Sequence, residues 1–481
     1  MKLPILLKSL QAEEHKEFEK FLQSPFFKSS EQYLKFFRCL CKYYPSFELE
    51  KADLQAAYRR CFGQSSLNDT KLYNLMSGLG KQLEQYLVVR MVLAPDGQDQ
   101  PPLYDYLLVR SLGQRNMGAY FRTKAQQLID ETAARPVKEV DNYLILNQLH
   151  QEVYYNPDTP KFSEHPANLQ LAVENLDLYY CLSKLRYVAE MKAREGILDI
   201  QYEMPLLEAV LELTAAPELQ DKHPLLASYH HLVRFYLQGY SEQGFRELMT
   251  LFRDKFSFLP RYDQSMLLKH LMNCGISLMS RDCAVESELF SLYKLGMEAN
   301  LLMGQNRLTH LTFINIVNLA SLCKEFDWAT AFIAKFSPFL EDSKRQASID
   351  LAMAGIYYYQ GMLDKAQTCL TPGIFPLPSF DLLGRSLLLK IVSDRYLLYD
   401  KDYEFLISYL HAFERYVQTK QLTTEKKDGF LNCIKFVRKM AATKFEMVDI
   451  PESKKESLRK KLKQLQPVVS KKWLEEKIEA L

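Results

Sequence analysis

Glycine-rich and nucleophile-bearing motifs are the first places to look for chemistry in this chain. The segment Gly78-Leu79-Gly80-Lys81 comes nearest to a phosphate-binding loop. A dinucleotide fingerprint, however, needs glycine where Leu83 stands, and a P-loop needs glycine where Leu75 stands. The segment Gly275-Ile276-Ser277-Leu278-Met279 departs from the nucleophile-elbow pattern Gly-x-Ser-x-Gly at its last residue. We therefore interpret these glycines as small residues where helices cross, and we predict no catalytic residue.

The histidines and carboxylates do not form a pattern that suits a metal ion or acid–base catalysis. None of the nine histidines has another histidine four residues away. His230 and His231 point about 100° apart on a helix, so they cannot share an ion from one face, and we expect His231 to pack between helices. Carboxylates such as Glu13 and Glu17 lie on the solvated side of an amphipathic helix. An unpaired carboxylate there does not need the shifted pKa that is typical of a catalytic acid or base. The sequence indicates a non-enzymatic protein without metal or cofactor.

Bulk charge and cysteine usage narrow the classes of partner and compartment. Lys and Arg number 61 against 59 Asp and Glu, so no global field favours nucleic acid or an acidic membrane. The nine cysteines include no CxxC pair, which is typical of reduced thiols in a cytoplasmic protein. Only five residues separate Lys2 from Lys8, fewer than the roughly seven to fifteen of a secretory h-region. We expect a cytoplasmic protein with no membrane partner.

Helical periodicity dominates the elements that must position any functional residue. Period-3.6 patterns follow one another from Leu3 to Leu481, and no convincing period-2 strand interrupts them, so we predict an all-α fold. The polar Pro/Gly stretch at 94–102 separates a head of four or five helices at 1–93 from a helical-repeat array at 103–446. Residues 447–481 are predicted to be basic C-terminal capping helices.

Two nearly equal stretches, 122 residues apart, indicate a repeated helical hairpin. Phe235–Tyr240 and Tyr357–Met362 each carry an aromatic pair and a glycine at the end of an amphipathic helix, and a second helix follows each. Turns of this kind are expected near Gly239, Ser280, Phe326, Gly361 and Lys401, with Phe326 standing in its unit where Gly361 stands. Their average spacing of about 40 residues compares with roughly 34 for tetratricopeptide and 40–47 for HEAT-type repeats. This periodicity predicts a solenoid of helical hairpins.

One unit carries a family resemblance. In Asp350–Leu370, the small Ala354, the aromatic Tyr357, Gly361 at the turn and the small Ala366 resemble a tetratricopeptide unit, because close helix packing needs small residues beside a filling ring. The resemblance implies a tetratricopeptide-like superhelix and is looser in the neighbouring units. The head resembles an uncharacterised bacterial helical family through two segments. These are Ser24-Pro25-Phe26-Phe27 and Asn68-Asp69-x-Lys71-Leu72-x-Asn74-Leu75-Met76-Ser77. This second resemblance implies no function.

If the tetratricopeptide resemblance holds, it places candidate partner-binding residues along a groove. It implies that Tyr358 and Tyr359 lie towards the concave side of a first helix, with Tyr236 as their counterpart and Lys324 between them. Exposed tyrosine suits the binding of a protein or peptide, because its ring offers a large contact area at low entropic cost. The alternative is that these rings belong to the core between hairpins, with Tyr357 as the buried member of its set.

The C-terminal segment is locally basic. Residues 452–481 contain nine basic and five acidic residues, a local net charge of +4, around an apolar stripe of Leu458, Leu462 and Leu465. The candidate contacts for an anionic partner such as RNA are Lys454, Lys455, Arg459, Lys460, Lys461 and Lys463. The alternative is a solubilising cap, which a solenoid needs at its end.

The sequence therefore favours a protein–protein interaction scaffold that uses the groove of a helical-repeat array. A second hypothesis is a nucleic-acid-linked regulator, in which the head or the basic tail binds DNA or RNA and the array senses a partner. The long head helix weakens this alternative, since it offers only Lys71, Lys81 and Arg90 as cations.

Overall fold

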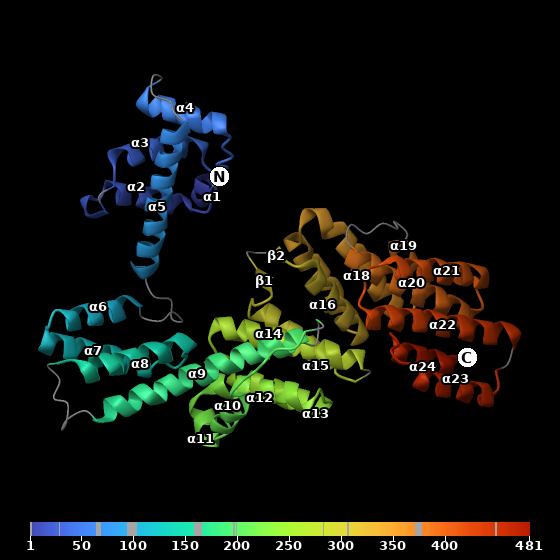
Figure 1. The fold of residues 1–481 in the computed structure, drawn as a ribbon. Coiled ribbons are helices and arrows are strands. Elements are labelled where there is room, and N and C mark those ends of the chain that lie inside the picture. The colour runs from blue at the N-terminus through green and yellow to red at the C-terminus, as the bar shows by residue number, and fades with distance from the viewer. Residues whose placement is uncertain are drawn as a thin grey trace. The chain divides into compact units, whose positions relative to one another are not determined.

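The chain folds almost entirely into α-helices in the computed structural model (Figure 1). The structure describes residues 2–27, 29–63, 69–93, 103–157, 166–195, 198, 200–281, 283–304, 307–370, 378–447 and 450–481. Within these residues the only strands are β1 (Met303–Gly304) and β2 (Arg307–Leu308), which pair antiparallel. The all-α prediction is confirmed. No helix in the described part of the chain has an apolar stretch long enough to cross a membrane.

The helices follow one another with short connections along most of the described residues. The first nine are α1 (Lys2–Lys8), α2 (Ala12–Gln23), α3 (Glu31–Leu40), α4 (Lys51–Phe62), α5 (Asp69–Leu93), α6 (Leu103–Gln114), α7 (Gly118–Ala133), α8 (Val140–Tyr155) and α9 (Pro166–Glu195). The next eight are α10 (Leu207–Leu213), α11 (Pro217–Lys222), α12 (Pro224–Gln238), α13 (Glu242–Lys255), α14 (Arg261–Ser280), α15 (Glu286–Glu298), α16 (His310–Leu322) and α17 (Phe326–Phe336). The last seven are α18 (Asp342–Tyr359), α19 (Leu363–Leu370), α20 (Pro378–Tyr399), α21 (Tyr403–Thr419), α22 (Thr424–Glu446), α23 (Glu452–Gln464) and α24 (Lys471–Ala480).

The chain divides into two compact units. Met1–Arg135 with Asp141–Asn175 forms the first, and Pro136–Val140 with Leu176–Leu481 forms the second. The predicted domain boundary at 94–102 lies outside the described residues, so it stays a prediction, as does the one at 447.

Five helices, α1 to α5, share one core in the first unit. The 3.6 period of α5 places its apolar residues on one face, and that face is buried. Its buried residues are Leu72, Leu75, Met76, Leu79, Leu83 and Tyr86. A Cβ added at Gly78 would lie 2.1 Å from the hydroxyl of Tyr33, so Gly78 does stand where α5 crosses α3. Gly80 has nothing within 4 Å of such a Cβ, so the same interpretation is not needed there.

The second unit contains five consecutive helical hairpins. Helix α12 packs on α13, α14 on α15, α16 on α17, α18 on α19 and α20 on α21. First helices of successive hairpins also pack on each other, namely α12 on α14, α16 on α18 and α18 on α20, and α20 packs in the same way on α22. Helix α24 packs on α20, α22 and α23 (Figure 1).

The hairpin turns lie near the five expected positions, with one correction. Gly361 has φ 76°, and the next amide, that of Met362, donates to the carbonyl of Tyr357 over 2.8 Å. Lys324 has φ 61°, and the next amide again donates five residues back over 2.8 Å. The residue equivalent to Gly361 is therefore Lys324. The assignment of Phe326 to the place of Gly361 was wrong by two residues, because in this turn a lysine adopts the left-handed conformation that glycine usually adopts.

Candidate functional site

The predicted groove tyrosines form hydrogen bonds between successive hairpins. Tyr236, in the last turn of α12, lies with its hydroxyl oxygen 3.0 Å from His270 Nδ1 on α14. Tyr358, in the last turn of α18, donates to Asp394 Oδ2 on α20 over 2.9 Å. Both tyrosines are half-buried, and burial raises the pKa of each hydroxyl. Each one thus joins a first helix to the first helix of the next hairpin.

A second link of this kind lies two turns earlier on α12. Tyr229 donates to Asp263 Oδ1 over 2.8 Å, and Arg186 of α9 donates to both carboxylate oxygens over 2.8 and 2.6 Å. Asp263 is fully buried, so these three donors replace the water it loses on folding. The guanidinium of Arg186 also lies 5.0 Å from the ring centroid of Tyr262. Helices α9, α12 and α14 are joined by this group.

Asp394 is the centre of a set of polar side chains between α18, α20 and α24, which we name the α20–α24 cluster: Tyr358, Lys390, Asp394, Trp473 and Lys477. Lys477 Nζ lies 2.9 Å from the oxygen of Asp394 that also accepts from Tyr358. Lys390 Nζ lies 5.8 Å from the ring centroid of Trp473. Burial lowers the pKa of Lys390 and raises that of Asp394, because both lose water.

The other two predicted groove residues, Tyr359 and Lys324, have different surroundings. Tyr359 is half-buried, and burial, with Glu476 and Glu286 nearby, raises its pKa to about 12. Lys324 is exposed at the turn between α16 and α17. Its place between the tyrosines along a groove stays a prediction. Tyr357, expected as the buried ring, is half-buried, with Lys365 Nζ 5.6 Å from its ring centroid.

The six basic candidates all lie on α23, but two of them are engaged within the protein. Arg459 pairs with Glu452, Glu456 and Glu479, and Lys455 donates to the carbonyl of Glu479 over 3.2 Å. The other four, Lys454, Lys460, Lys461 and Lys463, are exposed. Lys461 lies close enough to Lys439 of α22 to lower its pKa to about 8.

The two adjacent histidines lie the opposite way from the expectation. His230 is the buried one, with its Nδ1 2.7 Å from Thr214 Oγ1, whereas His231 is exposed and contacts Gln220 of α11 over 3.1 Å. Thr214 donates to the carbonyl of Val210, so its oxygen accepts from His230. The correction has a simple reason: the stretch is apolar on both sides, and only the packing of α10 decides which ring is covered.

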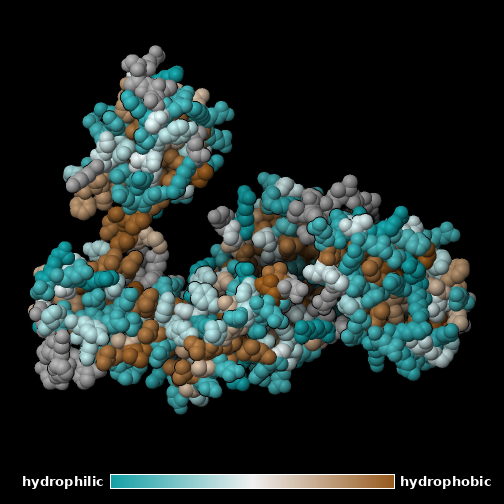
Figure 2. Space-filling view, in the orientation of Figure 1, coloured by the Kyte–Doolittle hydropathy of each residue, from teal (hydrophilic) through white to brown (hydrophobic). Residues whose placement is uncertain are grey.

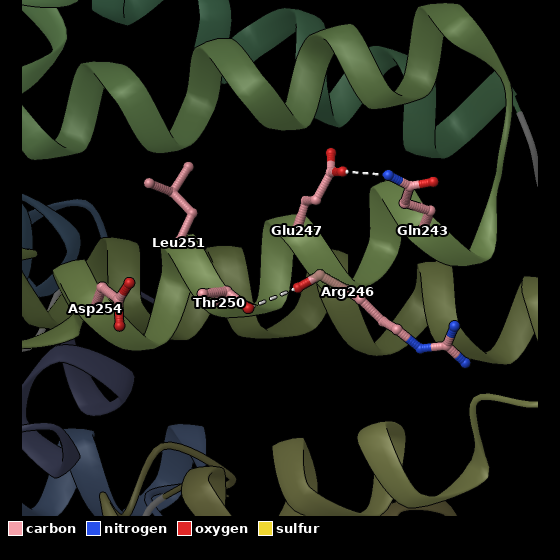
Figure 3. A pocket seen from close by; sticks show the side chains of 6 residues that line it. All are labelled: Gln243, Arg246, Glu247, Thr250, Leu251 and Asp254. Atoms are coloured by element: carbon pink, nitrogen blue, oxygen red, sulfur yellow. Dashed lines mark hydrogen bonds between the residues drawn. The ribbon is translucent and has the colours of Figure 1, made fainter.

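Two surface pockets of the described residues are lined by polar side chains that already bind within the protein. One is lined by Gln243, Arg246, Glu247, Thr250, Leu251 and Asp254, all on α13 (Figure 3). Gln243 donates to Glu247 over 3.0 Å, and Arg246 pairs with Glu288 of α15 over 2.7 Å. A second hollow lies in the head beside Glu17, Tyr86 and Arg90, where Tyr86 donates to Glu17 over 2.8 Å. These polar groups bind one another and hold helices together.

Lys390 and Asp394 were missed by sequence reasoning, although the sequence carries a signal for them. Lys390 lies within the otherwise apolar run Leu387–Val392, and Asp394 lies two residues after it. The two charged residues are four apart, so they share one face of α20. A charged pair inside an apolar helix face needs a partner on another element. Trp473 and Lys477 have the same spacing on α24.

Among the described residues, no group of three or more His, Cys, Asp or Glu side chains is placed to hold a metal ion. Comparison with known proteins returned no matching family model, no matching curated protein and no matching solved structure.

Proposed function

We propose that this protein is a non-enzymatic interaction scaffold, built as a tetratricopeptide-like array of helical hairpins. The observation that carries the proposal is that polar side chains join the first helix of one hairpin to the first helix of the next. Tyr236, Tyr358 and Asp263 all bind across successive first helices, so they serve the continuity of the array. In a continuous array of hairpins, the remaining function lies in its surface, which is how helical-repeat proteins work in general.

An exposed aromatic stripe on α9 supports a role in partner binding. Leu176, Tyr180 and Tyr187 stand four and seven residues apart, so they share one helix face, and their exposed fractions are 45%, 41% and 68%. Figure 2 shows hydrophobic residues among the mostly hydrophilic residues on the face in view. Tyrosine is enriched among the residues that dominate protein–protein affinity.

The test is affinity capture from the source cells with matched baits. The wild-type chain, a Tyr180→Ala/Tyr187→Ala variant and a Tyr399→Ala control are compared, since Tyr399 is also exposed but lies at the end of α20. We expect a partner that the wild type and the control retain, and whose recovery the double variant reduces about tenfold or more. A wild-type bait that retains no protein above empty matrix contradicts the proposal.

The nucleic-acid-linked regulator remains a second candidate because of one specific observation. The side chain of Lys461, together with burial and with Lys454, lowers the pKa of Lys439 to about 8, which indicates like charges near one another on α22 and α23. An anion between them relieves this repulsion. In the head, by contrast, Arg90 already pairs with Glu14 and Glu17, so it is not free for a phosphate.

A salt titration of nucleic-acid binding decides this second candidate. If it is correct, Lys454→Ala/Lys461→Ala weakens binding and reduces the slope of log K against log salt by up to about 2. Lys463→Ala, also on α23, reports the effect of removing one charge elsewhere on the helix. Absence of binding to DNA and RNA at low salt eliminates the candidate.

A further inference from the structure

Helix α24 covers a surface that several helices build together. Its apolar face is buried through Trp473, Leu474 and Ile478. The helix packs on α20 and α22, and Trp473 lies over Lys390 of α20. It is a ten-residue helix and follows the non-helical residues 465–470.

The charged side of α24 reaches two hairpins at once. Lys477 pairs with Asp394 on α20 over 2.9 Å, and Lys472 pairs with Glu286, the first residue of α15, over 3.1 Å. Asp394 also holds Tyr358 of α18. Besides its chain neighbour α23, this short helix therefore contacts α15, α20 and α22, and it reaches α18 through Asp394. Contacts spread over several helices are typical of a ligand on a helical-repeat array.

The polar groups beneath α24 make its attachment weaker than its apolar contacts suggest. The side chains of Asp394 and Lys477 are only 5% and 13% exposed, and the two charges lose their water when α24 docks. Asp394 Oδ1 and the indole Nε1 of Trp473 are buried as well, and the Trp473 side chain acts as a hydrogen-bond donor that favours the charged form of Asp394. These groups regain water when α24 leaves, which favours an opening equilibrium.

We propose that α24 is a displaceable internal ligand, and that the surface beneath it, lined by Tyr358, Lys390 and Asp394, binds an amphipathic helix of a partner protein. The partner half of this inference rests on the proposed scaffold function. The occupant already present defines the chemistry: an aromatic residue and a lysine four positions apart, with an aliphatic residue directly after each. An acidic residue corresponding to Glu476 completes the pattern, because the negative charge of Glu476 favours the charged form of Lys390.

The mechanism is competition for one surface. While α24 is docked, a partner helix sees only the open fraction of the protein, and its apparent affinity falls by that fraction. Loss of the Lys477–Asp394 contact, or of the Trp473 ring, increases the open fraction without altering Tyr358, Lys390 or Asp394. A partner helix then binds more tightly.

The experiment uses the full chain and a fluorescent synthetic peptide of Ser470–Leu481 as the probe. We expect the Trp473→Ala/Lys477→Ala variant to bind this peptide about tenfold or more tightly than the wild type does. The control, Lys463→Ala, removes an exposed lysine from α23 and is expected to bind like the wild type. Addition of Asp394→Ala to the double variant is expected to abolish the gain, because the peptide lysine then has no acceptor.

Equal peptide affinity of the wild type and a folded double variant overturns the proposal. If the double variant does not fold, hydrogen exchange of the wild type decides: amides of α24 must exchange through local opening faster than those of α20 and α22. Equal protection of the three helices also overturns it. Because the peptide is the protein's own segment, this outcome is independent of the capture experiment on the α9 stripe, and the two proposals fail separately.

Discussion

At the scale of single residues, the hydroxyl groups of tyrosines link neighbouring hairpins. Tyr229, Tyr236 and Tyr358 each reach from one first helix to a polar residue of the next. The sequence identifies Tyr236 and Tyr358, but not Tyr229, as part of a repeated pattern, and it does not show which polar residue each hydroxyl meets. That choice depends on the offset between two helices about 35 residues apart in the chain.

A matched pair of substitutions tests the role of Tyr358. Tyr358→Phe removes a hydrogen bond to the buried carboxylate of Asp394 and is expected to lower the free energy of unfolding by about 1.5–3 kcal/mol. Tyr357→Phe makes the same chemical change one residue away, where the ring lies beneath Lys365, and is expected to change it by less than about 0.5 kcal/mol. Urea titrations of both variants are the measurement, and equal effects contradict the assignment.

At the scale of elements, the hairpins depend on small residues and on turns that accept a left-handed residue. The turn at Gly361 has glycine at its left-handed position. In the turns at Lys324 and Asn300, residues with a side chain take this position, with φ 61° and φ 53°. Glycine is only the cheapest residue for this conformation, so a turn can occur without it when packing on both sides defines it. This is why sequence reasoning found the turn positions closely but misassigned the equivalent residue in one of them.

Ala366 tests the close packing of one hairpin. It is fully buried on α19, which packs on both α18 and α20, so Ala366→Leu is expected to overpack the site and cost about 1–3 kcal/mol of unfolding free energy. Thr368→Leu, on the exposed side of the same helix, is the control and is expected to be nearly neutral. The measurement is a denaturant titration, and a neutral Ala366→Leu shows that α19 does not pack closely there.

At the scale of the whole molecule, buried histidines make stability depend on pH. Burial lowers the pKa of His15, His270 and His310, and it lowers the pKa of His223 and His230 to about 4. An unfolded chain has histidine pKa values near 6.5 and binds more protons below that pH. These groups therefore contribute stability above pH 6.5, and the contribution is lost as pH falls towards 4.

His230 isolates this effect. Its neutral ring donates to Thr214, and His230→Asn keeps a donor at the same place while removing the titration. We expect the wild type to lose about 1–2 kcal/mol more than the variant between pH 7 and pH 5. Unfolding titrations at both pH values provide the measurement. Parallel losses in the two proteins mean that His230 remains accessible to protons in the folded state.

The sequence by itself determined the all-α class, the helices of the head and the approximate positions of the hairpin turns, because helix periodicity and turn chemistry are local properties. It also identified Tyr236 and Tyr358 as repeated, structurally equivalent residues. Only the tertiary structure decided that Lys390 and Asp394 lie beneath α24, that Lys324 is the left-handed residue of the turn after α16 and that His230 is buried in place of His231. These facts depend on contacts between segments distant in the chain, and a helical pattern states which face is apolar without stating what covers it.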